Sequence, residues 1–63
     1  MNSQLITVMK VFESLVKLNN YNVTRFDIQH YNYGNEIEGY CGYLYTEDKT
    51  ILIRGEGSFE IKD

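Results

Sequence analysis

The 63-residue chain contains one cysteine, no proline and no tryptophan. A single cysteine excludes a disulfide within the chain, whereas exported domains of this size usually carry an even set of cysteines. No apolar run approaches the ~20 residues of a membrane-spanning helix. The first residues also lack the basic region, apolar core and cleavage site of a signal peptide. From these absences we expect a cytoplasmic protein without a membrane segment.

Basic residues are scarce as well, since six Lys and Arg stand against nine Asp and Glu and give a net charge of −3. This balance favours a basic or neutral protein surface as partner over the phosphates of nucleic acid. The chain has one histidine, and its His, Cys and acidic residues do not recur at the spacing of metal ligands. We therefore expect no metal and no other cofactor.

Residue types used in catalysis are isolated in this sequence. No serine, cysteine or second histidine stands at a motif spacing from His30, which we expect at the rim of the inward face of a sheet. Cys41 is expected to be a small buried side chain, because a nucleophilic cysteine needs exposure and a nearby base or cation. The chain is also too short to enclose a substrate pocket of normal size, although a homodimer could build one between subunits. We expect no catalytic residues.

Residues 4–18 predict one amphipathic helix, because apolar side chains recur there at steps of three and four residues. The stripe consists of Leu5, Val8, Met9, Phe12, Leu15 and Val16. Asn2 or Ser3 can cap the start of this helix, and Asn19-Asn20 can end it. Val11 and Leu18 widen the stripe to about half of the circumference. They either rim the core or form the edge of a homodimer contact.

Three further segments predict β-strands, namely 21–32, 36–46 and 50–62. A two-residue turn at Gly34-Asn35 and a three-residue loop at Glu47-Asp48-Lys49 would join them into an antiparallel meander. In this register Tyr43 lies between Phe26 and Ile53 on an inward, apolar face, and a slip of one residue would scramble that face.

These elements predict one α+β domain over residues 1–63, with the N-terminal helix packed on one face of a three-stranded antiparallel sheet (αβββ). Gly39, Gly55 and Gly57 fall on the inward face in this register. Glycine weakens a strand and usually has a structural reason. We expect the helix to lie close to the sheet at these positions, or the third strand to bend there.

The opposite face of the sheet is the candidate binding surface, because one helix can cover only one face. Its expected contact residues are Tyr31, Tyr33, Glu38, Tyr40, Leu44, Leu52, Arg54 and Glu56. Gly42 would also point outward and let Arg54 lean toward Asp27. Tyrosine supplies a large contact area at low entropic cost and is enriched at interfaces. The alternative is ordinary cross-strand pairing on a solvated sheet.

Three functions are compatible with the sequence, in decreasing order of support. The first is a small non-enzymatic protein-binding module that docks on a larger protein through the open sheet face or a sheet edge. Inhibitors and accessory proteins of phages and other mobile elements often have this size, which supplies an analogy only. The second is single-stranded nucleic-acid binding by stacking on the tyrosines, against which the excess of acids argues. The third is an enzyme, which only the presence of isolated His, Cys and acidic residues supports.

Overall fold

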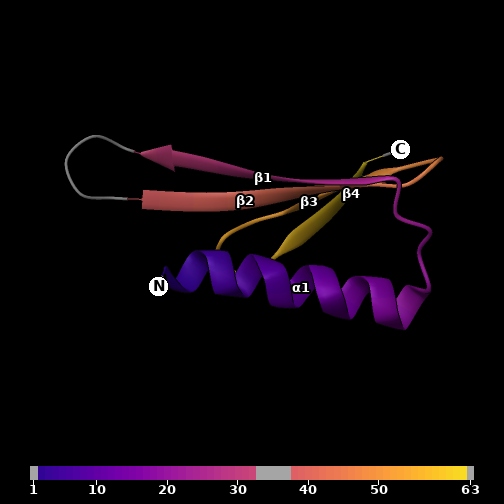
Figure 1. The fold of residues 1–63 in the computed structure, drawn as a ribbon, viewed down its shortest axis with the longest axis horizontal. Coiled ribbons are helices and arrows are strands. Elements are labelled where there is room, and N and C mark those ends of the chain that lie inside the picture. Colours follow the sequence, from indigo (N-terminus) through magenta and orange to yellow (C-terminus); the bar gives the residue numbers. More distant parts are fainter. Residues whose placement is uncertain (1, 33–37, 63) are drawn as a thin grey trace.

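The computed structural model describes residues 2–32 and 38–62. Its elements are α1 (Ser3–Asn19), β1 (Arg25–Asn32), β2 (Glu38–Tyr45), β3 (Thr50–Ile53) and β4 (Phe59–Lys62). The strands form one antiparallel sheet in the order β1-β2-β3-β4, and α1 lies along one face of it (Figure 1). The predicted α+β class is confirmed, whereas the prediction of three strands is wrong.

The fourth strand arises because the predicted strand 50–62 reverses at its glycines. The backbone N–H of Arg54 donates to the carbonyl of Ser58 (2.8 Å), and the N–H of Gly57 donates to the carbonyl of Arg54 (3.0 Å). Gly57 has a φ of +106°, a conformation that residues with a Cβ rarely adopt. A three-residue loop with glycine at its positive-φ position is a common hairpin connection. The segment is therefore a hairpin rather than one bent strand.

Local signals placed the helix within one residue at each end. The side-chain oxygen of Asn2 accepts hydrogen bonds from the backbone N–H groups of Gln4 (2.8 Å) and Leu5 (3.4 Å). This satisfies donors that have no partner inside the first turn. Asn20 closes the other end in the left-handed conformation, with φ 55° and ψ 41°.

The buried stripe of α1 is rotated from the predicted one. Val8 and Leu15 are buried, and Val11 packs against the core, while Met9 is 43% exposed. Phe12 stacks on Phe26 of β1 with ring centroids 3.9 Å apart. The core of the described residues consists of Val8, Leu15, Leu44, Ile51 and Ile53.

The strands pair one residue away from the predicted register. Leu44, not Tyr43, stands between Phe26 of β1 and Ile51 of β3. The cause lies in the β2–β3 turn, where the backbone N–H of Thr46 donates to the carbonyl of Lys49 at 3.0 Å. This bond closes a two-residue turn, Glu47-Asp48, in place of the expected three-residue loop. The predicted turn at Gly34-Asn35 lies outside the described residues.

Because side chains alternate along a strand, the slip moves every side chain of β2 to the other face. Leu44, expected on the open face, is fully buried beneath the helix. Gly42, also expected outward, faces the helix instead. A Cβ at Gly42 would lie 2.8 Å from Cγ1 of Val8 and 2.9 Å from Cε1 of Phe26. The absence of a side chain therefore allows the close approach of α1 to β2.

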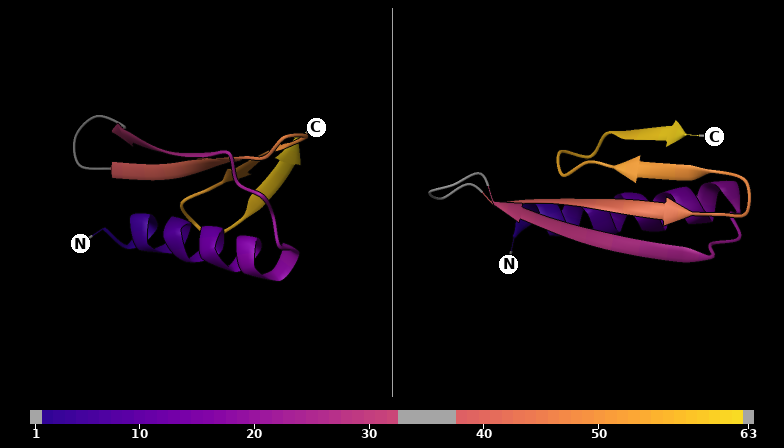
Figure 2. Two further views of the ribbon diagram at one scale, coloured as in Figure 1. Left: turned by 45° about the vertical axis from the view of Figure 1, so that its right-hand side comes forward. Right: turned by 90° about the horizontal axis from the view of Figure 1, so that it is seen from above.

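The helix covers only part of its side of the sheet. It contacts β2 and β3, while β4 lies beyond it, as the view from above shows (Figure 2). Phe59 and Ile61 face the helix side through their pairing with Ile53 and Ile51, yet they remain 46% and 48% exposed.

Candidate docking surface

The sheet face opposite the helix is covered by no element within residues 2–32 and 38–62 (Figure 1). Strand alternation places on it the residues Arg25, Asp27, Gln29 and Tyr31 of β1, Cys41, Tyr43 and Tyr45 of β2, Thr50 and Leu52 of β3, and Glu60 and Lys62 of β4. We call these residues, together with Arg54, the outer face. It is the side of the sheet that the sequence predicts to be open, although its membership differs on β2.

Four of the predicted binding residues come together in one hollow at the end of β3. The hollow has a volume of about 370 Å³. It is lined by Gln4, Tyr31, Cys41, Leu52, Arg54, Gly55 and Glu56. Three strands, the β3–β4 hairpin loop and the first turn of α1 therefore contribute to a single concave site, which we call the outer-face hollow.

The other predicted binding residues do not line this hollow, and one of them lies outside the described residues. Leu44 is buried in the core. Tyr40 lies on the helix side of β2, with its ring centroid 4.8 Å from that of His30. Both misplacements follow from the one-residue slip of β2. Tyr33 is outside the described residues, and Glu38 begins β2 with its backbone opposite Asn32.

Tyr31 owes its position to a glycine on the neighbouring strand. Gly39 stands directly opposite Tyr31 in the β1–β2 ladder. A Cβ at Gly39 would overlap the Tyr31 ring, so the ring lies over the bare backbone of β2. Gly39 was expected on the inward face. It instead leaves room on the outer face for the Tyr31 ring, which lines the outer-face hollow.

The two arginines of the outer face are each paired with a carboxylate. Nη2 of Arg54 lies 2.7 Å from Oε1 of Glu60, and Nε of Arg25 lies 2.8 Å from Oδ2 of Asp27. The hydrogen bond from Arg54 lowers the pKa of Glu60, and the bond to Asp27 raises the pKa of Arg25. The expected approach of Arg54 to Asp27 does not occur, because each group has a nearer partner. The pairs leave the face with little net charge.

Two tyrosines of the outer face were missed by the sequence analysis. Tyr43 and Tyr45 stack with ring centroids 6.4 Å apart, and the guanidinium of Arg25 lies 5.8 Å from the Tyr45 centroid. The signal that could have found them is the turn chemistry of β2–β3. The hydroxyl of Thr46 donates to Oδ1 of Asp48 at 3.0 Å, and Asp is typical of tight turns.

Cys41 and Glu56 complete the wall of the outer-face hollow. Cys41 lies on the outer face and is half-buried, whereas the sequence predicts a buried side chain. Burial raises the pKa of its thiol, which disfavours the reactive thiolate. The hydroxyl of Ser58 donates to Oε2 of Glu56 at 2.6 Å and lowers the pKa of that carboxyl. The hollow thus offers aromatic, aliphatic and hydrogen-bonding groups, with an acid at its rim.

In the part of the chain that the structure describes, no three His, Cys, Asp or Glu side chains gather to hold a metal ion. No helix of that part is long and apolar enough to cross a membrane. Comparison with known proteins found no matching family model, curated protein or solved structure.

Proposed function

We propose that this chain is a small non-enzymatic protein-binding module that docks on a larger protein through the outer face of its sheet. The observation that carries the proposal is the outer-face hollow, which Tyr31 and Leu52 help to line on the sheet face away from α1. Tyrosine and leucine supply apolar contact area at that hollow, and the adjacent hydroxyl and guanidinium groups give hydrogen bonds that fix orientation.

The chemistry of the surface indicates what kind of partner it fits. The volume of about 370 Å³ lies at the lower end of the range of roughly 300 to 1,000 Å³ for small-molecule pockets, and it also accommodates one or two inserted side chains of a partner. The arginines are neutralised by Glu60 and Asp27, and the chain carries a net charge of −3. A neutral or basic protein surface that projects an apolar side chain meets these conditions. An inhibitor or accessory protein acts in this way.

The ion pairs also separate this proposal from single-stranded nucleic-acid binding. Stacking of bases on a tyrosine-bearing sheet requires a positive groove along the phosphate backbone. Arg25 and Arg54 already have carboxylate partners at 2.8 and 2.7 Å. Phosphates would have to compete with those carboxylates, which favours a protein partner.

Affinity capture followed by titration with matched variants tests the function. Proteins recovered from the native host with tagged chain are purified, and their affinities for wild type, Leu52→Ser and Leu18→Ser are measured by calorimetry. We expect Leu52→Ser to weaken binding by about tenfold or more, as loss of a buried interface contact does. Leu18→Ser, a matched change on the helix side, should leave the affinity unchanged.

Two outcomes would contradict the proposal. In one, Leu18→Ser weakens binding while Leu52→Ser does not, which would move the contact to the helix side. In the other, the chain retards single-stranded oligonucleotides in a salt-sensitive manner and recovers no protein that binds it in purified form.

A further inference from the structure

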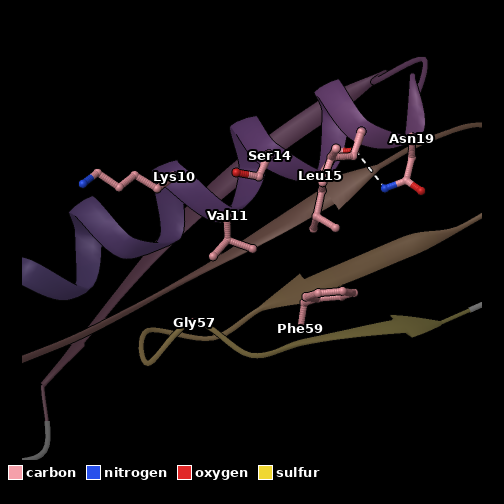
Figure 3. Close-up of a pocket in the computed structure, with 8 residues that line it drawn as sticks. Lys10, Val11, Ser14, Leu15, Asn19, Gly57 and Phe59 are labelled. Atoms are coloured by element: carbon pink, nitrogen blue, oxygen red, sulfur yellow. Dashed lines mark hydrogen bonds between the residues drawn. The ribbon is translucent and has the colours of Figure 1, made fainter.

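Strand β4 is the least covered element of the described structure. All four of its residues, Phe59–Lys62, are exposed, and it ends the sheet with β3 as its neighbour. Between β4 and α1 runs an apolar groove of about 480 Å³. Val11 and Leu15 project toward it from the helix, and the ring of Phe59 closes it from the sheet (Figure 3). Leu18 also lines it and is 83% exposed.

We propose that β4 pairs antiparallel with β4 of a second copy of this chain, across a two-fold axis that passes beside Ile61. The two four-stranded sheets would then form one continuous eight-stranded sheet. A chain of about this size has difficulty burying enough apolar surface alone, and self-association is one of the usual remedies.

The hydrogen-bond alternation of the β3–β4 hairpin shows which backbone groups are available for this pairing. The bond between Arg54 and Ser58 marks a hydrogen-bonded pair, so the pairs at Glu60 and Lys62 are also of that type. The polar backbone groups of Phe59 and Ile61 consequently point away from β3, toward the edge. An unpaired row of this kind is a template for another strand.

Charge and strand overlap together select one register among those that a two-fold axis permits, because an axis beside Phe59 would set Ile61 and Lys62 opposite the β3–β4 loop of the second copy. Residues directly opposite each other in an antiparallel pair share a face, so the axis must pass beside a residue of β4. An axis beside Glu60 would set two glutamates face to face, and an axis beside Lys62 would do the same with two lysines. Such like-charged pairs are destabilising. An axis beside Ile61 sets Glu60 opposite the Lys62 of the second copy, twice.

The same register also suits the apolar side of the strand. Ile61 meets its own copy as a hydrogen-bonded pair through its edge-facing backbone groups. Its side chain, 48% exposed in one copy, then lies beside an identical isoleucine. The Glu60–Lys62 contacts are of the closely spaced, non-hydrogen-bonded type, with Cα atoms about 4.5 Å apart. Because the axis is normal to the sheet, both helices lie on one side of it, and the two apolar grooves adjoin.

A charge-exchange experiment tests this register directly. Sedimentation equilibrium is measured for wild type, for Glu60→Lys, for Lys62→Glu, and for an equimolar mixture of the two variants. We expect wild type to form a species of twice the 7.4 kDa chain mass. Each variant alone should dimerise at least about tenfold more weakly, because two strands of the same sign then face each other. The mixture should dimerise like wild type, because one strand is then positive and the other negative.

The mixture also controls for damage to the fold. Glu60→Lys removes the ion pair with Arg54, but the same altered protein is present alone and in the mixture. Glu47→Lys, which changes the net charge equally at the exposed β2–β3 turn, should leave dimerisation unaffected. A single 7.4 kDa species of wild type up to millimolar concentration would overturn the proposal. So would a mixture that associates no better than its components.

Discussion

The side-chain oxygen of Gln4 accepts a hydrogen bond of 3.0 Å from the backbone N–H of Tyr40. It thereby ties the first turn of α1 to the stretch of β2 that extends beyond the end of β3, where β2 has β1 as its strand partner on one side. A side chain from the helix takes the place of a strand at this point.

Removing this side chain should destabilise the fold by the free energy that one part-buried hydrogen bond contributes. We expect Gln4→Ala to lower the free energy of unfolding by ~1 kcal/mol, because the N–H of Tyr40 loses its acceptor. Urea denaturation measures the change. Gln29→Ala, at an exposed position of β1, serves as control. A loss no larger for Gln4→Ala than for Gln29→Ala would show that water replaces the bond without cost.

Truncating the two leucines of the central strands distinguishes the observed register from the predicted one. Leu44 is fully buried, and Leu52 is half-buried on the outer face. Leu44→Ala should therefore cost ~2–5 kcal/mol of unfolding free energy, through lost transfer energy and a residual cavity. Leu52→Ala should cost clearly less in the same denaturant titration. Similar small losses for both variants would place Leu44 on the outer face beside Leu52, as in the predicted register, and would refute the observed one.

The ion pair between Arg54 and Glu60 predicts a dependence of stability on acid pH. The pKa of Glu60 is lowered below its ordinary value of 4.5, first by the hydrogen bond from Arg54. Its contribution to stability is therefore fully present above that ordinary value and is lost as the pH falls through the lower pKa of the folded state. Thermal midpoints recorded from neutral to strongly acidic pH should show a shallower acid decline for Glu60→Gln than for wild type. Glu47→Gln, which removes a carboxylate from an exposed turn, should retain the decline of wild type.

Cys41 should react slowly with thiol reagents while the protein is folded. Burial raises the pKa of its thiol, so less thiolate is present near neutral pH than for an exposed cysteine. We expect alkylation by iodoacetamide at pH 8 to accelerate when the chain is unfolded in urea. Mass spectrometry of quenched time points measures the rates. Equal rates in both states would mean that the thiol is freely accessible in the outer-face hollow.

The parts of the fold that depend on neighbouring residues were predictable, and the pairing of distant segments was not. Asn2, Asn20 and the three-to-four residue spacing define the helix locally. The register of β2 does not follow from local signals. Both faces of Tyr43-Leu44-Tyr45 carry large apolar groups, so the alternation of side chains does not choose which face is buried. The length of the β2–β3 turn makes the choice, and the sequence allows both a two-residue and a three-residue turn.

The same reasoning explains the outcome at the candidate site. Tyr31 on β1 and Leu52 on β3 were assigned to the outer face, and the structure places both in one hollow. Tyr40 and Leu44 lie on β2, so the single slip moves both of them to the helix side. The fourth strand was missed because Gly55 and Gly57 were read as packing positions within a strand, whereas they form a hairpin loop.

The outer face lies on the side of the sheet away from α1, and a two-fold axis normal to the sheet would repeat it without turning it over. Both hollows of the proposed dimer would then open in one direction, on a common plane. A target that displays its binding site more than once, such as a filament or a symmetric ring, would be bound at two points. The second binding event would then benefit from a high effective concentration. A module with weak affinity per site could in this way hold a repetitive target firmly while releasing single copies of it.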